Sequence, residues 1–271
     1  MSTAAVEVRA FRPGDEVEIN DTRNRVLGTA RSLDEWAWRH PAAGAERPIV
    51  VARRDGRLVA HLAALPLRLK LGDRELAAAA VVDAFVVPEA GDDRQRAAIW
   101  AQTVAAFLAA YGPGRRFEVV FRIAAGATPG APPVLGGEEL ALSAPSRLVR
   151  SRTQRSPPSR LAYRAEPARD WEPRLDELWR RVREQHPAAA VRDAEHALAR
   201  HAGHPHRRRH RFLALPRFGR RPFAFAAFER AGEECRWVDL LWDHRHPGAL
   251  ALLAHLSGRL APQLGAAREA L

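Results

Sequence analysis

The chain has 271 residues, enough for one large domain or two small ones. Its 43 basic and 32 acidic residues give a net charge of +11, which favours anionic partners such as a phosphorylated ligand, an acidic protein or nucleic acid. The single cysteine, Cys235, excludes an internal disulfide. The sequence contains no apolar run of roughly 18 residues, so we expect no membrane helix. The first residues lack the pattern of a signal peptide, so we expect a cytoplasmic protein.

The first half opens with a strand and two helices. Residues 6–11 alternate between apolar and polar side chains, as in a strand with one buried face. Asp15 follows a proline–glycine pair and is predicted to be the N-cap of a helix. Ser32 and Glu35 have the spacing of a capping box, which predicts a second helix ending near His40. Its two tryptophans are expected to pack in the core rather than form a stacking platform.

Three strands should follow as a meander. Residues 48–53 and 58–71 form two strands joined by Asp55-Gly56, a pair typical of a two-residue hairpin turn. A second turn leads into a third strand over residues 75–87. Pro66 lies inside the long strand and predicts a bulge or an edge there, because proline has no N–H to donate.

The third strand leads into a helix. Residues 81–87 are β-branched and aromatic enough for a buried strand, and Pro88 ends it. From Arg94 to Tyr111, apolar residues recur at helical spacing. A helix N-terminus after a polar loop can hold a phosphate, because its free N–H groups and its dipole favour an anion. A core strand followed by a packed helix, with no ligand, explains the pattern equally well.

The first half closes with a strand over residues 117–123 and a flexible, proline-rich loop after it. The predicted order β-α-α-β-β-β-α-β is typical of a mixed α/β fold. A Ser-, Pro- and Arg-rich stretch then suggests a linker whose arginines form a solvated basic face or, less favourably, contact an anion. We therefore predict a first domain at residues 1–145, a linker at 146–160 and a second domain at 161–271.

The second half repeats the pattern of the first. Arg39-His40 recurs as Arg200-His201, 161 positions later, and Val82-Asp83 recurs as Val238-Asp239, 156 positions later. Strands and helices are predicted in the same order as before, at residues 161–164, 174–183, 192–201, 212–216, 222–229, 236–241 and 247–260.

With this repeat in place, the chain resembles the GCN5-related N-acetyltransferase (GNAT) superfamily, in particular bacterial members with two GNAT-like halves. The resemblance rests on residues 49–61, 65–69, 82–88, 94–99, 175–179 and 191–195. It implies that acetyl-CoA or another acyl-CoA lies between the fourth and fifth strands as co-substrate. Backbone groups of Phe85, Val86 and Val87 would then contact the pantetheine. The pyrophosphate would lie on a loop of six residues, Arg94, Gln95, Arg96, Ala97, Ala98 and Ile99.

The sequence departs from the family pattern at several positions. Ala97 replaces the first glycine of the loop and Ile99 the second small residue, and three acids precede the loop within residues 89–93. Residues 124–128 stand where close relatives carry a Pro-Asn pair and often a tyrosine that acts as general acid. Because the chain ends soon after its last predicted helix, we expect a truncated second half without a fifth strand. A homodimer or a protein partner would complete it.

The candidate catalytic residue is Asp83, which would remove a proton from the amine through water, while its alternative role is a structural carboxylate paired with arginine. His61 is expected to be a hydrogen-bonded strand histidine and Cys235 an inert strand thiol. No metal is predicted, because the three histidines of the basic run at 204, 206 and 210 have neighbouring cations and no acid to complete a site.

The leading function is therefore acyl-CoA-dependent transfer of an acyl group, acetyl being the first candidate, to an amine of a small molecule or peptide. The alternative is a catalytically degenerate GNAT-like protein that binds a partner or an acyl ligand. A basic nucleic-acid binder is a third and less favoured interpretation, because no aromatic residues interleave the basic run.

Overall fold

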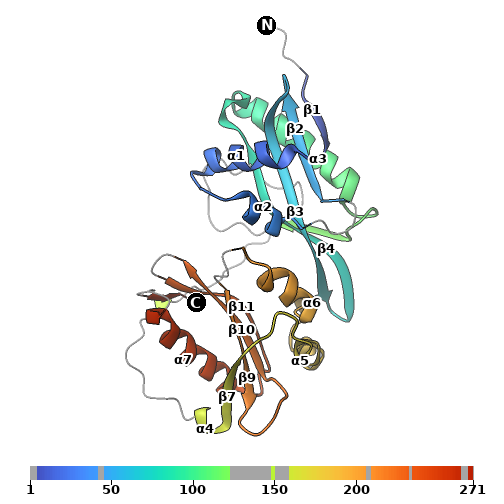
Figure 1. Cartoon of the computed structure of the whole chain (residues 1–271). Helices are drawn as coiled ribbons and strands as arrows, with labels where there is room; N and C mark the ends of the chain where they lie inside the picture. The colour runs from blue at the N-terminus through green and yellow to red at the C-terminus, as the bar shows by residue number, and fades with distance from the viewer. Residues whose placement is uncertain are drawn as a thin grey trace. The chain divides into compact units, whose positions relative to one another are not determined.

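The computed structural model describes residues 5–41, 46–122, 148–149, 159–205, 209–231, 234–263 and 268–270 (Figure 1). They belong to two compact units, Met1–Leu140 and Ala141–Leu271, each with its own sheet and its own core. No helix within the described ranges is long and apolar enough to cross a bilayer. The linker predicted at residues 146–160 and the loop predicted after the first half lie mostly outside these ranges.

The first unit contains a sheet of five strands in the order β1-β2-β3-β4-β5. All neighbours are antiparallel except β4 and β5, because a helix crosses over between these two. The turn between β2 and β3 has the positive φ angles at Asp55 and Gly56 that a two-residue hairpin requires. The strands are β1 (Glu7–Ala10), β2 (Ile49–Arg54), β3 (Arg57–Leu71), β4 (Arg74–Val86) and β5 (Val119–Arg122).

Helices cover both faces of this sheet, with α1 and α2 on one face and α3 on the other (Figure 1). The burial of β3 agrees, since every residue from Leu58 to Ala64 is buried and successive side chains point to opposite faces. The helices are α1 (Asp15–Leu27), α2 (Leu33–Arg39) and α3 (Asp93–Tyr111), with a short 3-10 turn, η1 (Pro88–Ala90), before α3.

The sequence predicted the N-caps of α1 and α2, and one of the two predictions is confirmed. The capping box of Ser32 and Glu35 is present at α2 and confirms that prediction. The N-cap of α1 is Gly14 rather than Asp15, so that prediction was wrong by one residue. Asp15 is instead the first helical residue, and its carboxylate accepts hydrogen bonds from Arg9, at 2.7 and 2.8 Å, and from the Arg12 N–H at 2.8 Å.

A β-bulge interrupts the pairing of β3 with β4. Ala63 lies opposite Asp83 and Ala64 lies opposite Val81, so Val82 is the extra residue. At Pro66, where the sequence predicted a bulge or an edge, the β3–β4 register continues without a shift. The pairing of β2 with β3 ends at Ala63, three residues before the proline.

The second unit contains a sheet in the order β6-β12-β11-β10-β9-β7, of which β7 to β12 repeat the order of the first sheet. β11 and β12 are parallel and flank a helix, as β4 and β5 do. Its strands are β6 (Leu148–Val149), β7 (Tyr163–Pro167), β9 (Arg209–Pro216), β10 (Ala224–Ala231), β11 (Glu234–Trp242) and β12 (Arg268–Ala270), and the short strand β8 (Ala188–Ala190) is not part of this sheet. The helices are α4 (Ser159–Ala162), α5 (Arg174–Val182), α6 (Ala194–Ala197) and α7 (Pro247–Gln263), with short turns η2 (Arg183–Gln185) and η3 (Leu198–Ala202).

Two predictions for this unit are corrected. Residues 161–164 were predicted as a strand, but α4 occupies Ser159–Ala162 and the strand β7 begins at Tyr163. The fifth strand was predicted to be missing, yet Arg268–Ala270 forms β12, parallel to β11. The second half is therefore not truncated at that strand, and the reason for expecting a partner to complete it disappears.

Candidate functional site

The edge of β4 beyond the bulge is the first candidate site. β5 pairs with β4 only from Ala78 to Val81, and no later residue of β4 has a β5 partner among the described residues. The last pair joins Val81 to Arg122, the last residue of β5, and the bulge with its extra residue Val82 begins directly after this pair in β4, where it bends the strand and increases the local twist. The last five residues of β4 thus leave one backbone edge unpaired within the described part of the sheet.

The direction of each amide on this edge follows from one hydrogen bond. The N–H of Val87 donates to the carbonyl oxygen of Val59 in β3, at 2.9 Å. Amide directions alternate along a strand, so the N–H of Phe85 also faces β3, while those of Ala84 and Val86 face the open edge. Of the three strand residues predicted to contact pantetheine, Val86 therefore offers its backbone N–H, and Phe85 and Val87 contribute buried side chains.

The loop from β4 to α3 is closed by its own side chains. The carboxylate of Asp92 accepts the N–H of Gln95 at 2.8 Å, and the amide oxygen of Gln95 accepts the N–H of Asp92 at 3.0 Å. Arg96 donates to the carbonyl oxygen of Gly91 at 2.6 Å and pairs with Asp93. This capping box was not foreseen, although Asp92 and Gln95 have the spacing that revealed the one at α2.

The six residues predicted to bind pyrophosphate therefore have different surroundings. Gln95 and Arg96 bond to their own loop, and Ile99 is buried in the core. Arg94, Ala97 and Ala98 are exposed on the first turns of α3. The sequence of this loop matched the family pattern only loosely, and its geometry places a carboxylate where an anion would have to bind.

Asp83, the predicted base, is buried among cations. It accepts a hydrogen bond from His40 Nε2 at 2.9 Å and one from Arg23 Nε at 3.3 Å, and it forms an ion pair with Arg31. Burial alone would raise the pKa of Asp83, but the His40 hydrogen bond and the Arg31 charge outweigh it and hold that pKa well below its usual range. So weak a base accepts a proton poorly, and the geometry favours the alternative role as an ion-pair centre.

Residues 7–110, which contain β1 to α3, match the family model of the acetyltransferase (GNAT) domain. The first unit of this chain is a GNAT domain. The edge of β4 that was described above thus belongs to the fold in which the resemblance expected an acyl donor to bind.

Solved structures with related folds cover both units. A probable N-acyltransferase from Enterococcus faecalis V583 aligns over 98% of this chain with TM-score 0.65 and 10% identity. A GCN5-related N-acetyltransferase from Anabaena variabilis ATCC 29413 aligns over 98% with TM-score 0.67 and 15% identity. N-myristoyltransferase from Saccharomyces cerevisiae, solved with bound myristoyl-CoA and inhibitors, aligns over 100% with TM-score 0.63 and 10% identity.

At these identities the likeness establishes the fold alone. The chain spans 65% of the length of the Enterococcus and Anabaena proteins, and 74% of the yeast protein. No curated protein matches the sequence.

The second unit contains a counterpart of the Asp83 cluster of the GNAT domain. Asp239 accepts hydrogen bonds from Arg192 Nε at 2.7 Å, His201 Nε2 at 3.0 Å and His196 Nε2 at 3.1 Å. It also follows a bulge, because Ala227 lies opposite Asp239 and Phe228 opposite Trp237. The repeated dipeptides found in the sequence therefore lie at corresponding places in the two sheets.

The repeated dipeptides contained His40, His201 and the aspartate of each cluster, and also Arg39, which lies 3.9 Å from Asp83, but Arg31, Arg192 and His196 were missed. Arg31 and Arg192 are separated by the same 161 positions as His40 and His201, and each precedes the N-cap of its helix. Extending the repeat from the Arg-His pair toward the N-terminus would have identified them.

His196, His201 and Asp239 also form the one group among the described residues whose ligand atoms lie close enough for a metal ion, within 4.8 Å of one another. Arg209 contacts His201 Nδ1 at 3.3 Å and can only donate. His201 must then carry its proton on Nε2 and donate it to Asp239, which leaves no Nε2 lone pair for a metal. This tautomer argues against a metal ion at this group. The sequence analysis considered three other histidines: those at 204 and 210 do not belong to this group, and the one at 206 lies outside the described residues.

His61 differs from its expectation. It lies in β3, as predicted, and its ring stacks on Phe85 with centroids 5.3 Å apart. It is completely buried, and neither ring nitrogen has a hydrogen-bond partner among the described residues, so the prediction of a hydrogen-bonded histidine is corrected. Burial lowers the pKa of His61 to about 3, and the ring is neutral at physiological pH.

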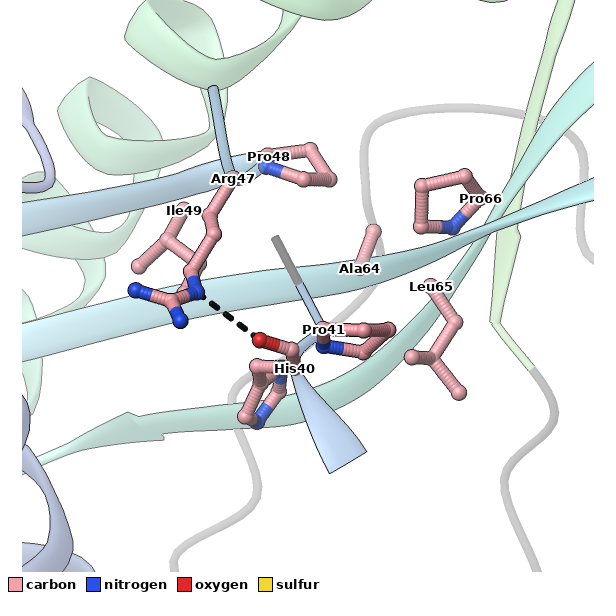
Figure 2. Close-up of a pocket in the computed structure, with 8 residues that line it drawn as sticks. All are labelled: His40, Pro41, Arg47, Pro48, Ile49, Ala64, Leu65 and Pro66. Carbon is pink, nitrogen blue, oxygen red and sulfur yellow. Dashed lines mark hydrogen bonds between the residues drawn. The ribbon is translucent and has the colours of Figure 1, made fainter. Parts of the chain in front are cut away.

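A surface niche borders the Asp83 cluster at His40 (Figure 2). Arg47 Nε donates to the carbonyl oxygen of His40 at 2.8 Å and holds the end of α2 beside β2. The niche is mostly apolar and has no space large enough for a water molecule. It is therefore a packing seam and not a substrate site. Its lining residues are His40, Pro41, Arg47, Pro48, Ile49, Ala64, Leu65 and Pro66.

Proposed function

We propose that this protein transfers an acyl group from a pantetheine thioester, as in acyl-CoA, to an amine. One observation carries the proposal: within a GNAT domain, the edge of β4 beyond Val82 offers N–H groups of Ala84 and Val86 that face away from β3 and pair with no described residue of β5. An extended pantetheine arm, with its two amides, can pair with such an edge as an added strand does. Acetyl as the acyl group, a small-molecule or peptide amine as acceptor and a cytoplasmic location belong to the same proposal.

The reaction needs little more from the protein than this edge. The neutral amine nitrogen attacks the thioester carbonyl carbon, and the carbonyl oxygen becomes an oxyanion beside the N–H of Ala84 or Val86. The carbon–sulfur bond then breaks, the thiolate leaves with the electron pair, and the proton released by the nitrogen passes through water to the thiolate. A water-mediated relay of that proton through Asp83 is the alternative route, but the ion pairs of Asp83 with Arg31 and His40 favour its role as an ion-pair centre.

The related solved structures support this choice of reaction class. The Anabaena protein is described as an N-acetyltransferase, the Enterococcus protein as a probable N-acyltransferase, and the yeast enzyme was solved with myristoyl-CoA. The topology of the second unit suggests a second GNAT-like copy in the same chain.

The test is an assay of thiol release from acetyl-CoA and longer acyl-CoAs with a panel of primary amines. Amine-dependent release of thiol, with the acylated amine identified by mass spectrometry, is the expected result. The absence of acylated amine with every donor and acceptor contradicts the proposal.

One observation favours a second candidate function. The closed loop before α3 weakens the expected phosphate site, as in a GNAT-like protein that binds a ligand or partner without catalysis. Binding of a non-reactive acyl-pantetheine analogue without turnover of any donor would select this candidate.

A further inference from the structure

The closed start of α3 carries a more specific inference, which rests on the proposed function. We propose that the donor is recognised through its acyl-pantetheine arm alone and that the 3′-phospho-ADP half of CoA contributes nothing to recognition. The arm occurs in two sources, acyl-CoA and an acyl carrier protein. Both present the same thioester to the edge of β4.

A side chain occupies one of the free N–H groups at the start of α3. A helix normally offers its first N–H groups to an anion. Here the N–H of Gln95 donates to the Asp92 carboxylate at 2.8 Å, while the N–H of Arg96 makes the first intrahelical bond, to the Asp92 carbonyl, at 2.9 Å. The carboxylate already occupies the position of an anion, and a second anion next to it would be repelled.

The space beside the loop glycine is also occupied. Gly91 has a φ of 131°, and a Cβ placed on it would lie 1.9 Å from Oε1 of Gln95. A glycine at such a loop can let a phosphate approach the backbone closely. In this chain the glycine instead makes room for the side chain that closes the capping box, so the approach is filled by the protein itself.

The cations around the loop are bound to the protein's own groups. Arg25 pairs with Glu89 at 2.7 Å, Arg54 donates to the carbonyl oxygen of Ala90 at 2.8 Å, and Arg96 bonds to Gly91 and Asp93. Arg94 is exposed and makes no hydrogen bond or ion pair with any described residue. Beyond Arg94, a diphosphate could gain only the buried Nε of Arg54, which has no hydrogen-bond partner among the described residues, without displacing an internal bond.

What remains for donor binding is the strand edge, which pairs with amides and needs no charge. The net charge of +11 adds a long-range attraction for acidic molecules, and an acidic carrier protein fits it as well as free acyl-CoA does.

The experiment compares one acyl chain on three donors: CoA, pantetheine and an acidic acyl carrier protein. We expect kcat/KM for acyl-pantetheine within about threefold of that for acyl-CoA, and no competition by adenosine 3′,5′-bisphosphate. A preference for acyl-CoA of about thirtyfold or more overturns the inference. A carrier-bound donor that reacts fastest, with an advantage that salt removes, supports the inference and identifies the carrier as the source. Equal rates with all donors support it and identify the free thioester.

A binding measurement separates this inference from the proposed function. Calorimetry with non-reactive thioether analogues of acyl-CoA and acyl-pantetheine should give equal affinities. Equal binding without turnover leaves the inference standing and refutes the acyltransferase. Turnover together with much tighter binding of the CoA analogue supports the acyltransferase and refutes the inference.

The variant Asp92→Ser with Gln95→Gly opens the space beside Gly91 and removes the carboxylate. It should raise the preference for acyl-CoA over acyl-pantetheine by about tenfold. Glu35→Gly, which opens the capping box of α2 in the same way, is the matched control and should leave the preference unchanged. An unchanged preference in a folded double variant contradicts the role of the closed loop.

Discussion

Asp83 is the residue at which three elements of the GNAT domain meet. Arg23 comes from α1, Arg31 from the turn before α2, and His40 from the end of α2, while Asp83 itself lies on β4. Removing the charge of a buried carboxylate leaves its cationic partners unpaired, which typically costs several kcal/mol. This single side chain therefore fixes the position of α1 and α2 on the sheet.

Asp83→Asn distinguishes the two roles considered for this residue. If Asp83 is an ion-pair centre, the variant should lose about 3–5 kcal/mol of unfolding free energy, because Arg31 and His40 stay buried without the carboxylate. The kcat of the remaining folded protein should change little. Urea unfolding and the pH profile of acyl transfer measure the two quantities. A stable variant with a large loss of kcat would identify Asp83 as the base.

His61 gives the GNAT domain a pH-dependent stability with a predictable sign. Its pKa is lowered to about 3 by burial, whereas in the unfolded chain it is about 6.5. Between these two pKa values only the unfolded state binds the proton. The contribution of His61 to the unfolding free energy is therefore fully present at pH 7 and falls as the pH drops from about 6.5 toward 3.

His61→Phe should remove this dependence, because phenylalanine can keep the stacking on Phe85 and cannot be protonated. Between pH 7 and 5 the wild type should lose about 2 kcal/mol of unfolding free energy more than the variant does. Urea unfolding at the two pH values measures it. Parallel losses in both proteins would show that His61 becomes protonated without unfolding.

At the scale of the element, the open edge of β4 can be tested through one amide. Val86→Pro removes an N–H that faces the open edge and leaves the hydrogen bonds to β3 in place. It should lower kcat/KM by about 10²- to 10³-fold, as the loss of an oxyanion donor does. Val86→Ala, which keeps the N–H, is the control and should stay within a few-fold of wild type. Thermal denaturation must first show that both variants fold. A folded proline variant with unchanged kcat/KM excludes this edge from catalysis.

Much of the element order could be predicted from the sequence, because local patterns determine it. The hairpin turn at Asp55-Gly56, the capping box at Ser32 and the β-branched run of β4 each specify their structure within a few residues. β12 could not be found this way. Arg-Glu-Ala has no strand preference, and these residues are a strand because they pair with β11 and β6.

The candidate site was only partly predictable for the same reason. Phe85 and Val86 were assigned to the correct strand, and Val87 lies one residue past its end, but which amide faces the open edge depends on the bulge at Val82 and on pairing with β3. The arginines around Asp83 are far from it in the sequence, and only folding brings them together.

At the scale of the whole molecule, the two units repeat one arrangement: a bulged strand, an aspartate after the bulge, and a histidine and an arginine from the helical layer. The identity between the copies is low, yet these positions correspond. Each copy keeps a buried ion pair whose loss would be costly, and the two copies can be altered independently.

Asp239→Asn should thus destabilise the second unit by about 3–5 kcal/mol, as Asp83→Asn does the first. Acyl transfer per folded molecule should remain within about threefold of wild type, because the open edge of the GNAT domain is intact. Denaturant unfolding and kcat/KM test both statements. A large loss of turnover in folded Asp239→Asn would show that the second unit takes part in the reaction.

The extra residue Val82 can also be considered as an insertion in an otherwise regular sheet. Deleting it would let β3 and β4 pair without interruption, since Val81 and Asp83 would then oppose Ala64 and Ala63 as neighbours. The straightened strand would lose the local bend and twist that the bulge gives to the edge that we assign to the donor. We therefore expect the deletion to raise the unfolding free energy and to abolish acyl transfer, which is a trade-off between stability and activity.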